Sequence, residues 1–211
     1  IYYGKGRDQY DVRGRVAHES IFNVNDGNYR SPNSQQGFSG FTTWTRGLSW
    51  AMLGFTEFLE FLENEKPPIP DLENIKETFL NAAKAVCDFY MVNTGADGIP
   101  YWDTGAPNLY KLGDYSKVAA DPFNDFEPVD SSAAAIGAQG LIRLGNLLRH
   151  TSPRDSKKYE QAGLTTLNTL LSDTYLSKDK NHQGILLHTN YHCPNGWDYI
   201  PEGSKISNGE S

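Results

Sequence analysis

The sequence predicts an all-α fold of long amphipathic helices, with a small β-hairpin near the N-terminus. Apolar residues recur at helical spacing over four stretches of about five turns each. The loops between them are long and rich in Trp, Tyr, His, Asp and Gly, and long loops in a compact domain are usually functional. Near the start, Asn25-Asp26-Gly27-Asn28 separates two extended segments. Such a turn cluster is typical of a hairpin.

The first two helices are expected on either side of a proline-rich connector. The apolar positions of the first, between Thr43 and Glu63, are Leu48, Ala51, Leu53, Phe55, Phe58, Leu59 and Leu62. Lys66-Pro67-Pro68-Ile69-Pro70 stops this helix, because proline lacks the N–H that a helix needs. Asp71 then caps a second helix that ends around Asn93.

The second pair of helices follows a stretch without clear periodicity, residues 95–129. Asp130-Ser131-Ser132 caps a helix that reaches about Arg149, and its internal glycines indicate close helix packing. Ser152-Pro153-Arg154-Asp155 begins the last helix, which ends at Leu171 or Tyr175. A strand-like run over 184–188 then leads into an aromatic loop over 190–199.

Composition narrows the classes of partner. The net charge of −7 argues against a nucleic-acid partner, because phosphate binding needs a basic stripe. Every apolar run is broken within a few residues, so no membrane span is expected. No targeting segment is visible, but the chain starts with Ile1 rather than Met, so an upstream segment could be absent and the compartment stays open. Cys87 and Cys193 form neither a metal spacing nor a redox pair.

The segment from Gln35 to Trp50 is an aromatic, glycine-rich loop that enters a helix. It places an amide (Gln36), a guanidinium (Arg46) and an indole (Trp50) around the helix entrance. This combination suits an anionic sugar, and Arg46 and Trp50 share a helix face because they are four residues apart. On this segment alone, the alternative that Trp44 and Trp50 are core residues and Arg46 is a solvated charge is slightly favoured.

The remaining candidates are histidines and aspartates in loops. His18 could face a pocket, because it alternates out of phase with its apolar neighbours. His188 and His192 bracket Tyr191 in a loop that indicates a sugar-binding wall rather than a metal site, because no carboxylate stands at ligand spacing. Asp103, beside Trp102, is a weak candidate for a catalytic acid. Motifs of serine hydrolases, nucleotide-binding proteins and zinc proteases are absent from the sequence.

Five short blocks of sequence stand out in order along the chain. They are Gln35-Gln36-Gly37-Phe38-Ser39, Thr43-Trp44-Thr45-Arg46-Gly47-Leu48-Ser49-Trp50, Pro100-Tyr101-Trp102-Asp103, Asp130-Ser131-Ser132-Ala133-Ala134-Ala135 and Gly184-Ile185-Leu186-Leu187-His188-Thr189-Asn190-Tyr191-His192. Together they resemble the unsaturated glucuronyl hydrolases of glycoside hydrolase family 88, across most of the chain.

The resemblance implies an (α/α)6 toroid of helical hairpins, of which residues 1–211 would be one part of a single catalytic domain, with N- and C-terminal portions missing. It also implies a glycoside hydrolase that removes a terminal 4,5-unsaturated uronic acid from oligosaccharides made by polysaccharide lyases, by hydration of a vinyl ether. The implied partner is that oligosaccharide, without a cofactor or a metal. By motif match the pocket residues are His18, Gln36, Arg46, Trp50 and Trp102, with Tyr191 and His192 on a looser match.

The chain also departs from the family pattern. The family's two aspartates, including its catalytic acid, would fall before Ile1, and Leu48-Ser49 replaces Gln-Ala. Residues 104–129 look like an insertion. Two alternatives therefore stay open. One is a non-catalytic carbohydrate-binding or degenerate toroid protein. The other is a different toroid activity, such as a lyase or an epimerase, with Tyr191 or His192 as the base.

Overall fold

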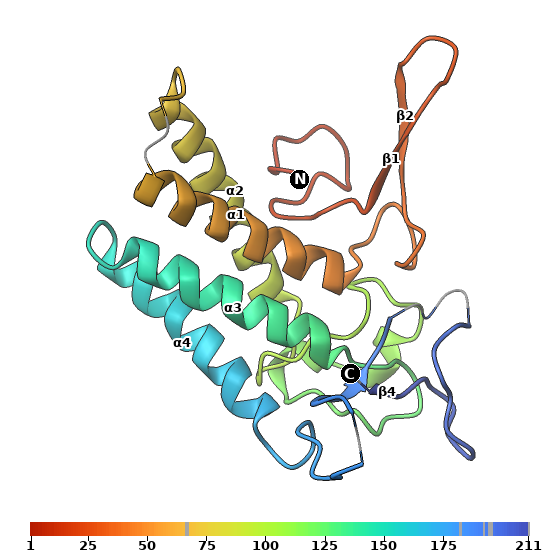
Figure 1. Cartoon of the computed structure of the whole chain (residues 1–211). Coiled ribbons are helices and arrows are strands. Elements are labelled where there is room, and N and C mark those ends of the chain that lie inside the picture. Colours follow the sequence, from red (N-terminus) through yellow and green to blue (C-terminus); the bar gives the residue numbers. More distant parts are fainter. Residues whose placement is uncertain (66–67, 182, 192, 194–195, 211) are drawn as a thin grey trace.

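Four helices form two antiparallel hairpins in the computed structural model, which describes residues 1–65, 68–181, 183–191, 193 and 196–210. The first hairpin joins α1 (Thr45–Glu65) to α2 (Leu72–Val92), and the second joins α3 (Ser131–Leu148) to α4 (Pro153–Leu170). Helix α1 packs against both α2 and α3, and α3 packs against α4 (Figure 1). Helices α1 and α3 begin at the same end of the molecule, where the long loops gather (Figure 1). All four predicted helices are confirmed to within a few residues.

The core lies between these helices, and α3 approaches α1 closely. Its largest fully buried side chains include Leu48, Met52, Tyr90, Leu141 and Tyr159. A Cβ added to Gly140 of α3 would lie only 2.9 Å from the backbone of Met52 on α1, so only glycine allows this approach. The prediction of close packing at the internal glycines of α3 is confirmed.

The helix starts agree with the predicted caps in one case and differ in two. The Asp130 carboxylate accepts hydrogen bonds from the N–H groups of Ser132 and Ala133 and caps α3 as predicted. Asp71 has a left-handed backbone (φ 61°), and its side chain accepts from Asn74 Nδ2 without capping α2. Ser152 precedes Pro153 of α4 but makes no side-chain cap.

The predicted hairpin is present near the N-terminus. Strand β1 (Glu19–Phe22) pairs with β2 (Tyr29–Asn33) in antiparallel register, with an irregularity between Ile21 and Phe22. At the other end of the chain, β3 (Leu187–Thr189) pairs with β4 (Gly209–Glu210). The predicted strand therefore begins three residues later than expected. Strand β4 was not predicted at all, because its two residues carry no sequence pattern.

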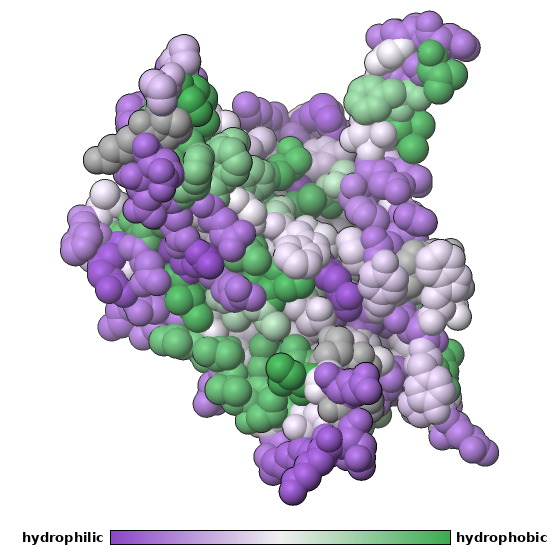
Figure 2. All heavy atoms as spheres, in the orientation of Figure 1, coloured by the Kyte–Doolittle hydropathy of each residue, from purple (hydrophilic) through white to green (hydrophobic). Residues whose placement is uncertain are grey.

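Some apolar side chains of the helices remain on the surface. Figure 2 shows such groups along the outer side of α4, where Leu164 and Leu167 are exposed, and on α1 the exposed side chains include Phe58 and Phe61. Contiguous apolar surface of this kind usually marks a site of contact with other protein elements. Within the described parts of the chain, none of the helices has the length and apolar character needed to span a membrane.

Candidate functional site

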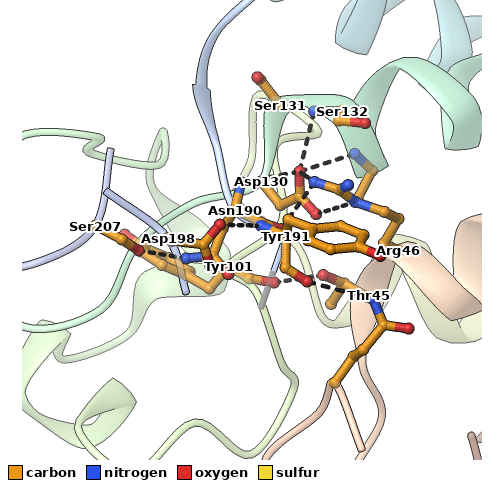
Figure 3. Close-up of polar contacts among 12 residues, drawn as sticks. Thr45, Arg46, Tyr101, Asp130, Ser131, Ser132, Asn190, Tyr191, Asp198 and Ser207 are labelled. Carbon is orange, nitrogen blue, oxygen red and sulfur yellow. Dashed lines mark hydrogen bonds and ion pairs between the residues drawn. The ribbon is translucent and has the colours of Figure 1, made fainter. Parts of the chain in front are cut away.

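A buried ion pair joins the N-terminal ends of α1 and α3. Arg46 Nε lies 2.9 Å from Asp130 Oδ2, and Arg46 Nη2 lies 3.0 Å from Asp130 Oδ1 (Figure 3). The side chain of Asp130 is 0% exposed and that of Arg46 is 13% exposed. Two parallel charge-assisted bonds fix the guanidinium plane as well as its position. The pair therefore sets the geometry of the loop end of the molecule.

Asp130 is well suited to hold a cation here. Its carboxylate caps α3, where the helix dipole favours negative charge, and Asn190 N also donates to Oδ1 at 3.4 Å. Arg46 Nη2 in turn donates to the carbonyl of Asn190 at 2.8 Å. Three segments far apart in the sequence are thus joined at one point.

The arrangement limits which atoms of Arg46 could bind a ligand. From the sequence, its planar fork was expected to face a ligand carboxylate, or the side chain to be solvated. Instead the Nε–Nη2 edge is occupied by Asp130. Its Nη1 has no hydrogen-bond partner among the residues that the structure describes. Any ligand contact of Arg46 would therefore use Nη1.

Tyr191 and Gln36 lie beside this ion pair. The guanidinium carbon of Arg46 is 5.5 Å from the centre of the Tyr191 ring, within the range of a cation–π contact. Tyr191 N donates to Asp198 Oδ1 at 2.8 Å, and Gln36 Nε2 reaches the Tyr191 carbonyl at 3.5 Å. The structure thus brings Gln36, Arg46 and Tyr191 together. His192 lies outside the described residues.

The two tryptophans of the first block differ in environment. Trp50 lies one turn after Arg46 on α1 and is 54% exposed, so its indole face is open to a ligand. Trp44 is buried, and its ring lies 4.7 Å from that of His18. The interpretation of both as core residues is therefore correct for Trp44 and wrong for Trp50.

His18 lies at the edge of the same loop. Its Nδ1 is 3.3 Å from Ser34 Oγ, which accepts from Gly37 N at 2.8 Å. Gly37 follows Gln36, so the imidazole contacts the turn that carries the amide. His18 is partly buried and remains a candidate for binding through this loop.

Trp102 faces a separate cavity of about 480 Å³. Its side chain is only 3% exposed, and its Nε1 donates to Glu127 Oε2 at 2.7 Å. Glu127 Oε1 accepts from Asn108 N at 2.6 Å. Trp102 is thus part of the wall of this cavity, and its expected role as a pocket residue stays a prediction. Its neighbours along this cavity include Phe38, Phe126, Asp198 and Lys205.

Asp103 holds two loops together. It is fully buried, and its two carboxylate oxygens accept from Phe38 N and Gly105 N, each at 2.9 Å. Burial raises the pKa of Asp103 above its ordinary value, against the opposing effect of these backbone donors. A carboxylate so enclosed cannot reach a ligand. The weak candidacy of Asp103 as an acid is therefore replaced by a structural role.

Replacing Asp103 by Asn should lower the free energy of unfolding by about 1–3 kcal/mol, because an amide donor would then face the N–H of Phe38. Since the folded-state pKa of Asp103 is raised, the contribution of its titration is complete below pH 3.8 and declines as the pH rises through the folded pKa. The difference between the two proteins should therefore shrink with rising pH. Denaturant titrations over that range measure it, and a constant difference would contradict the assignment.

Two residues of this cluster were missed as functional contacts by sequence reasoning. Asp130 was recognised only as a cap, and Asn190 was not singled out, although it is 1% exposed and its Nδ2 contacts Ser207. An aspartate cap opposite an arginine in the first turn of another helix was the available signal. Within the described part of the chain, no group of three or more His, Cys, Asp or Glu could hold a metal ion.

Comparison with known proteins finds relatives that share one name. No family model matches the chain. It is 30% identical over 191 residues to an unsaturated glucuronyl hydrolase of Formosa agariphila, an alignment that covers 89% of this chain and 38% of that protein. It is 28% identical to the enzyme of the same name from Bacillus sp. GL1, over 85% of this chain and 40% of the relative.

A solved structure is similar as well. The crystal structure of the Bacillus sp. GL1 unsaturated glucuronyl hydrolase, described as responsible for the degradation of glycosaminoglycan, superimposes with a TM-score of 0.65 at 27% identity. The match covers 94% of this chain and 44% of that chain. The two hairpins thus have the arrangement found in a helical toroid, as the sequence predicts. The chain spans about two fifths of the length of the curated relatives that it matches.

Proposed function

The chain belongs to the unsaturated glucuronyl hydrolase family, and from this premise we propose that it forms part of a toroid domain that removes a terminal 4,5-unsaturated uronic acid from oligosaccharides. Support comes from relatives named for this activity and from the meeting of Gln36, Arg46 and Tyr191 at the helix entrances. The observation that carries the proposal is the guanidinium of Arg46, held in place with Nη1 directed away from Asp130.

In the proposed reaction, a proton is added to C4 of the C4=C5 double bond and water adds to C5. The resulting hemiketal opens by breaking the bond between C5 and the ring oxygen, which leaves a ketone at C5. The hemiacetal at C1 then releases the rest of the sugar as an alcohol. The reaction consumes one water for each glycosidic bond and needs no oxidant or reductant.

The described residues would bind the sugar and orient it, rather than supply the proton. Arg46 Nη1 and Gln36 would donate to the carboxylate and hydroxyl groups, and Trp50 and Tyr191 would pack against the ring. The carboxylate of Asp130 pairs with Arg46 and caps α3, and that of Asp103 is buried against the loop backbone. Neither is therefore proposed as the proton donor. The proposed acid is therefore one of the family's aspartates, which would precede Ile1.

The direct test follows the ultraviolet absorbance of the conjugated C4=C5 carboxylate, using the protein translated from the whole reading frame. Unsaturated disaccharides from lyase digests of several polysaccharides serve as substrates. We expect the absorbance to fall with at least one of them, with release of the second sugar. A saturated disaccharide of the same composition is the control and should remain intact. Binding without any decay would favour the non-catalytic alternative, and formation of new double bonds would indicate a lyase.

A further inference from the structure

A second cavity lies on the N-terminal side of the molecule, against the base of the β1–β2 hairpin. Its volume is about 400 Å³, and three arginines and one aspartate line it, which leaves two positive charges. This is unusual in a chain whose net charge is −7. The residues that matter most are Arg7, Arg15, Arg30, Tyr2, Tyr10 and Phe41.

Arg15 lines this cavity, and among the described residues it has no acidic partner. The residue is only 3% exposed, and its Nε and Nη1 donate to the carbonyls of Tyr10 (2.6 Å) and Gly40 (3.3 Å). Within the described ranges, its Nη2 is buried without a hydrogen-bond partner, and no carboxylate forms an ion pair with it. A buried cation without a carboxylate beside it is costly, so this position favours the binding of an anion.

The neighbouring arginines, Arg7 and Arg30, add to the positive electrostatic potential of this cavity. Tyr2 lies between two guanidinium groups, with the Arg15 carbon 3.8 Å and the Arg7 carbon 4.7 Å from its ring centre. Although burial alone would raise it, the pKa of Tyr2 lies below its ordinary value, because Arg7 and Arg15 stabilise the phenolate. Arg7 pairs with Asp8, and Arg30 pairs with Asp26. Among the described residues, Arg15 is the arginine of the cavity left without an acid.

We propose that this cavity binds the sulfate or carboxylate group of an acidic sugar. The rim arginines Arg7 and Arg30 would donate directly to the anion, and Arg15 would supply charge from below. The rings of Tyr10 and Phe41, with centres 4.4 Å apart, form an apolar wall for the sugar ring. The choice of a sugar as the carrier rests on the proposed function, but the anion site does not.

The cavity is separate from the cluster around Arg46 and from the cavity beside Trp102. Phe38 lines the latter, and Phe41 lines the arginine cavity, so the loop over 36–44 stands between the two cavities. Gly40 of this loop packs closely on Pro32, where an added Cβ would lie 2.4 Å from the carbonyl oxygen. The site is therefore a second point of contact for an acidic saccharide.

Calorimetric titration of the whole protein tests the proposal. The probes are lactose carrying one sulfate ester, a saturated disaccharide ending in glucuronic acid, and unmodified lactose. We expect one or both anionic probes to bind and lactose not to bind. Arg15→Met and Arg30→Met should each weaken that binding roughly tenfold or more, the effect of losing a charged contact. Because Arg30 is exposed, its variant keeps the test valid if Arg15→Met does not fold.

Arg13→Met is the matched control. Arg13 is close in sequence but pairs with Asp88 and does not line the cavity, so its replacement should leave binding unchanged. Equal affinity for the anionic probes in the Arg30→Met protein and the unaltered protein would overturn the proposal, as would equal binding of lactose. The sulfated probe has no carboxylate, so its binding is independent of the uronate reaction. Arginine-dependent binding without hydrolysis would leave this inference standing and reject the activity.

Discussion

Replacing Asp130 by Ala should destabilise the protein by about 3–5 kcal/mol, the largest loss expected from any single change at this site. The substitution leaves the guanidinium of Arg46 buried without its bidentate partner. It also exposes the N–H groups of Ser132 and Ala133 at the start of α3, since the cap is lost. Denaturant unfolding, followed by the circular dichroism of the helices, measures the change.

Two variants separate the contributions of charge and cap. Asp130→Asn keeps an oxygen for the cap but removes the charge, so it should remain closer to the unaltered protein than Asp130→Ala. Asp114→Asn breaks an exposed pair with Lys117 and should hardly move the transition midpoint. If Asp130→Ala unfolded at the same denaturant concentration as Asp114→Asn, the ion pair between Arg46 and Asp130 would contribute nothing measurable to stability.

The helices were predictable because each carries its own signal. Apolar spacing located α1, and Asp130 followed by two serines located the start of α3. The error at Asp71 has a local cause, because the left-handed backbone there turns the carboxylate away from the N–H groups that it was expected to cap. Strand β4 depends entirely on pairing with β3, a partner about twenty residues earlier, so nothing in its own residues indicates it.

The candidate site was predictable in its residue types but not in its pairings. Arg46 and Asp130 are 84 positions apart, and each has a plausible separate role in its own segment. Only the packing of α1 against α3 shows that they meet. Trp102 and Asp103 show another limit, because they lie in a stretch without clear periodicity and their burial could not be predicted from it. The residue types indicate the chemistry, and packing decides which side chains a ligand can reach.

Under the proposed function, Arg46→Met in the whole protein should lower kcat/KM for an unsaturated disaccharide by roughly 10- to 150-fold, the equivalent of a charged hydrogen bond of about 1.5–3 kcal/mol. The side chain of Met fills similar space but cannot donate to a carboxylate. It also leaves Asp130 without its cation, so the fold should weaken in the same variant. Kinetic measurements must therefore be made at a temperature where the variant is fully folded. Arg46→Lys keeps the charge but loses the planar pair of donors. Its kcat/KM should therefore lie between those of Arg46→Met and the unaltered protein.

Arg143→Met provides the matched control for this prediction. Arg143 also joins α3 to α1, through Glu57 and Glu60, but it lies away from the helix entrances. Its loss should reduce stability and leave kcat/KM unchanged. If both variants lost activity in proportion to their loss of stability, Arg46 would act only as a strut between two helices. A selective loss in Arg46→Met alone, at equal folded fraction, assigns the uronate contact to the one guanidinium that Asp130 holds in place.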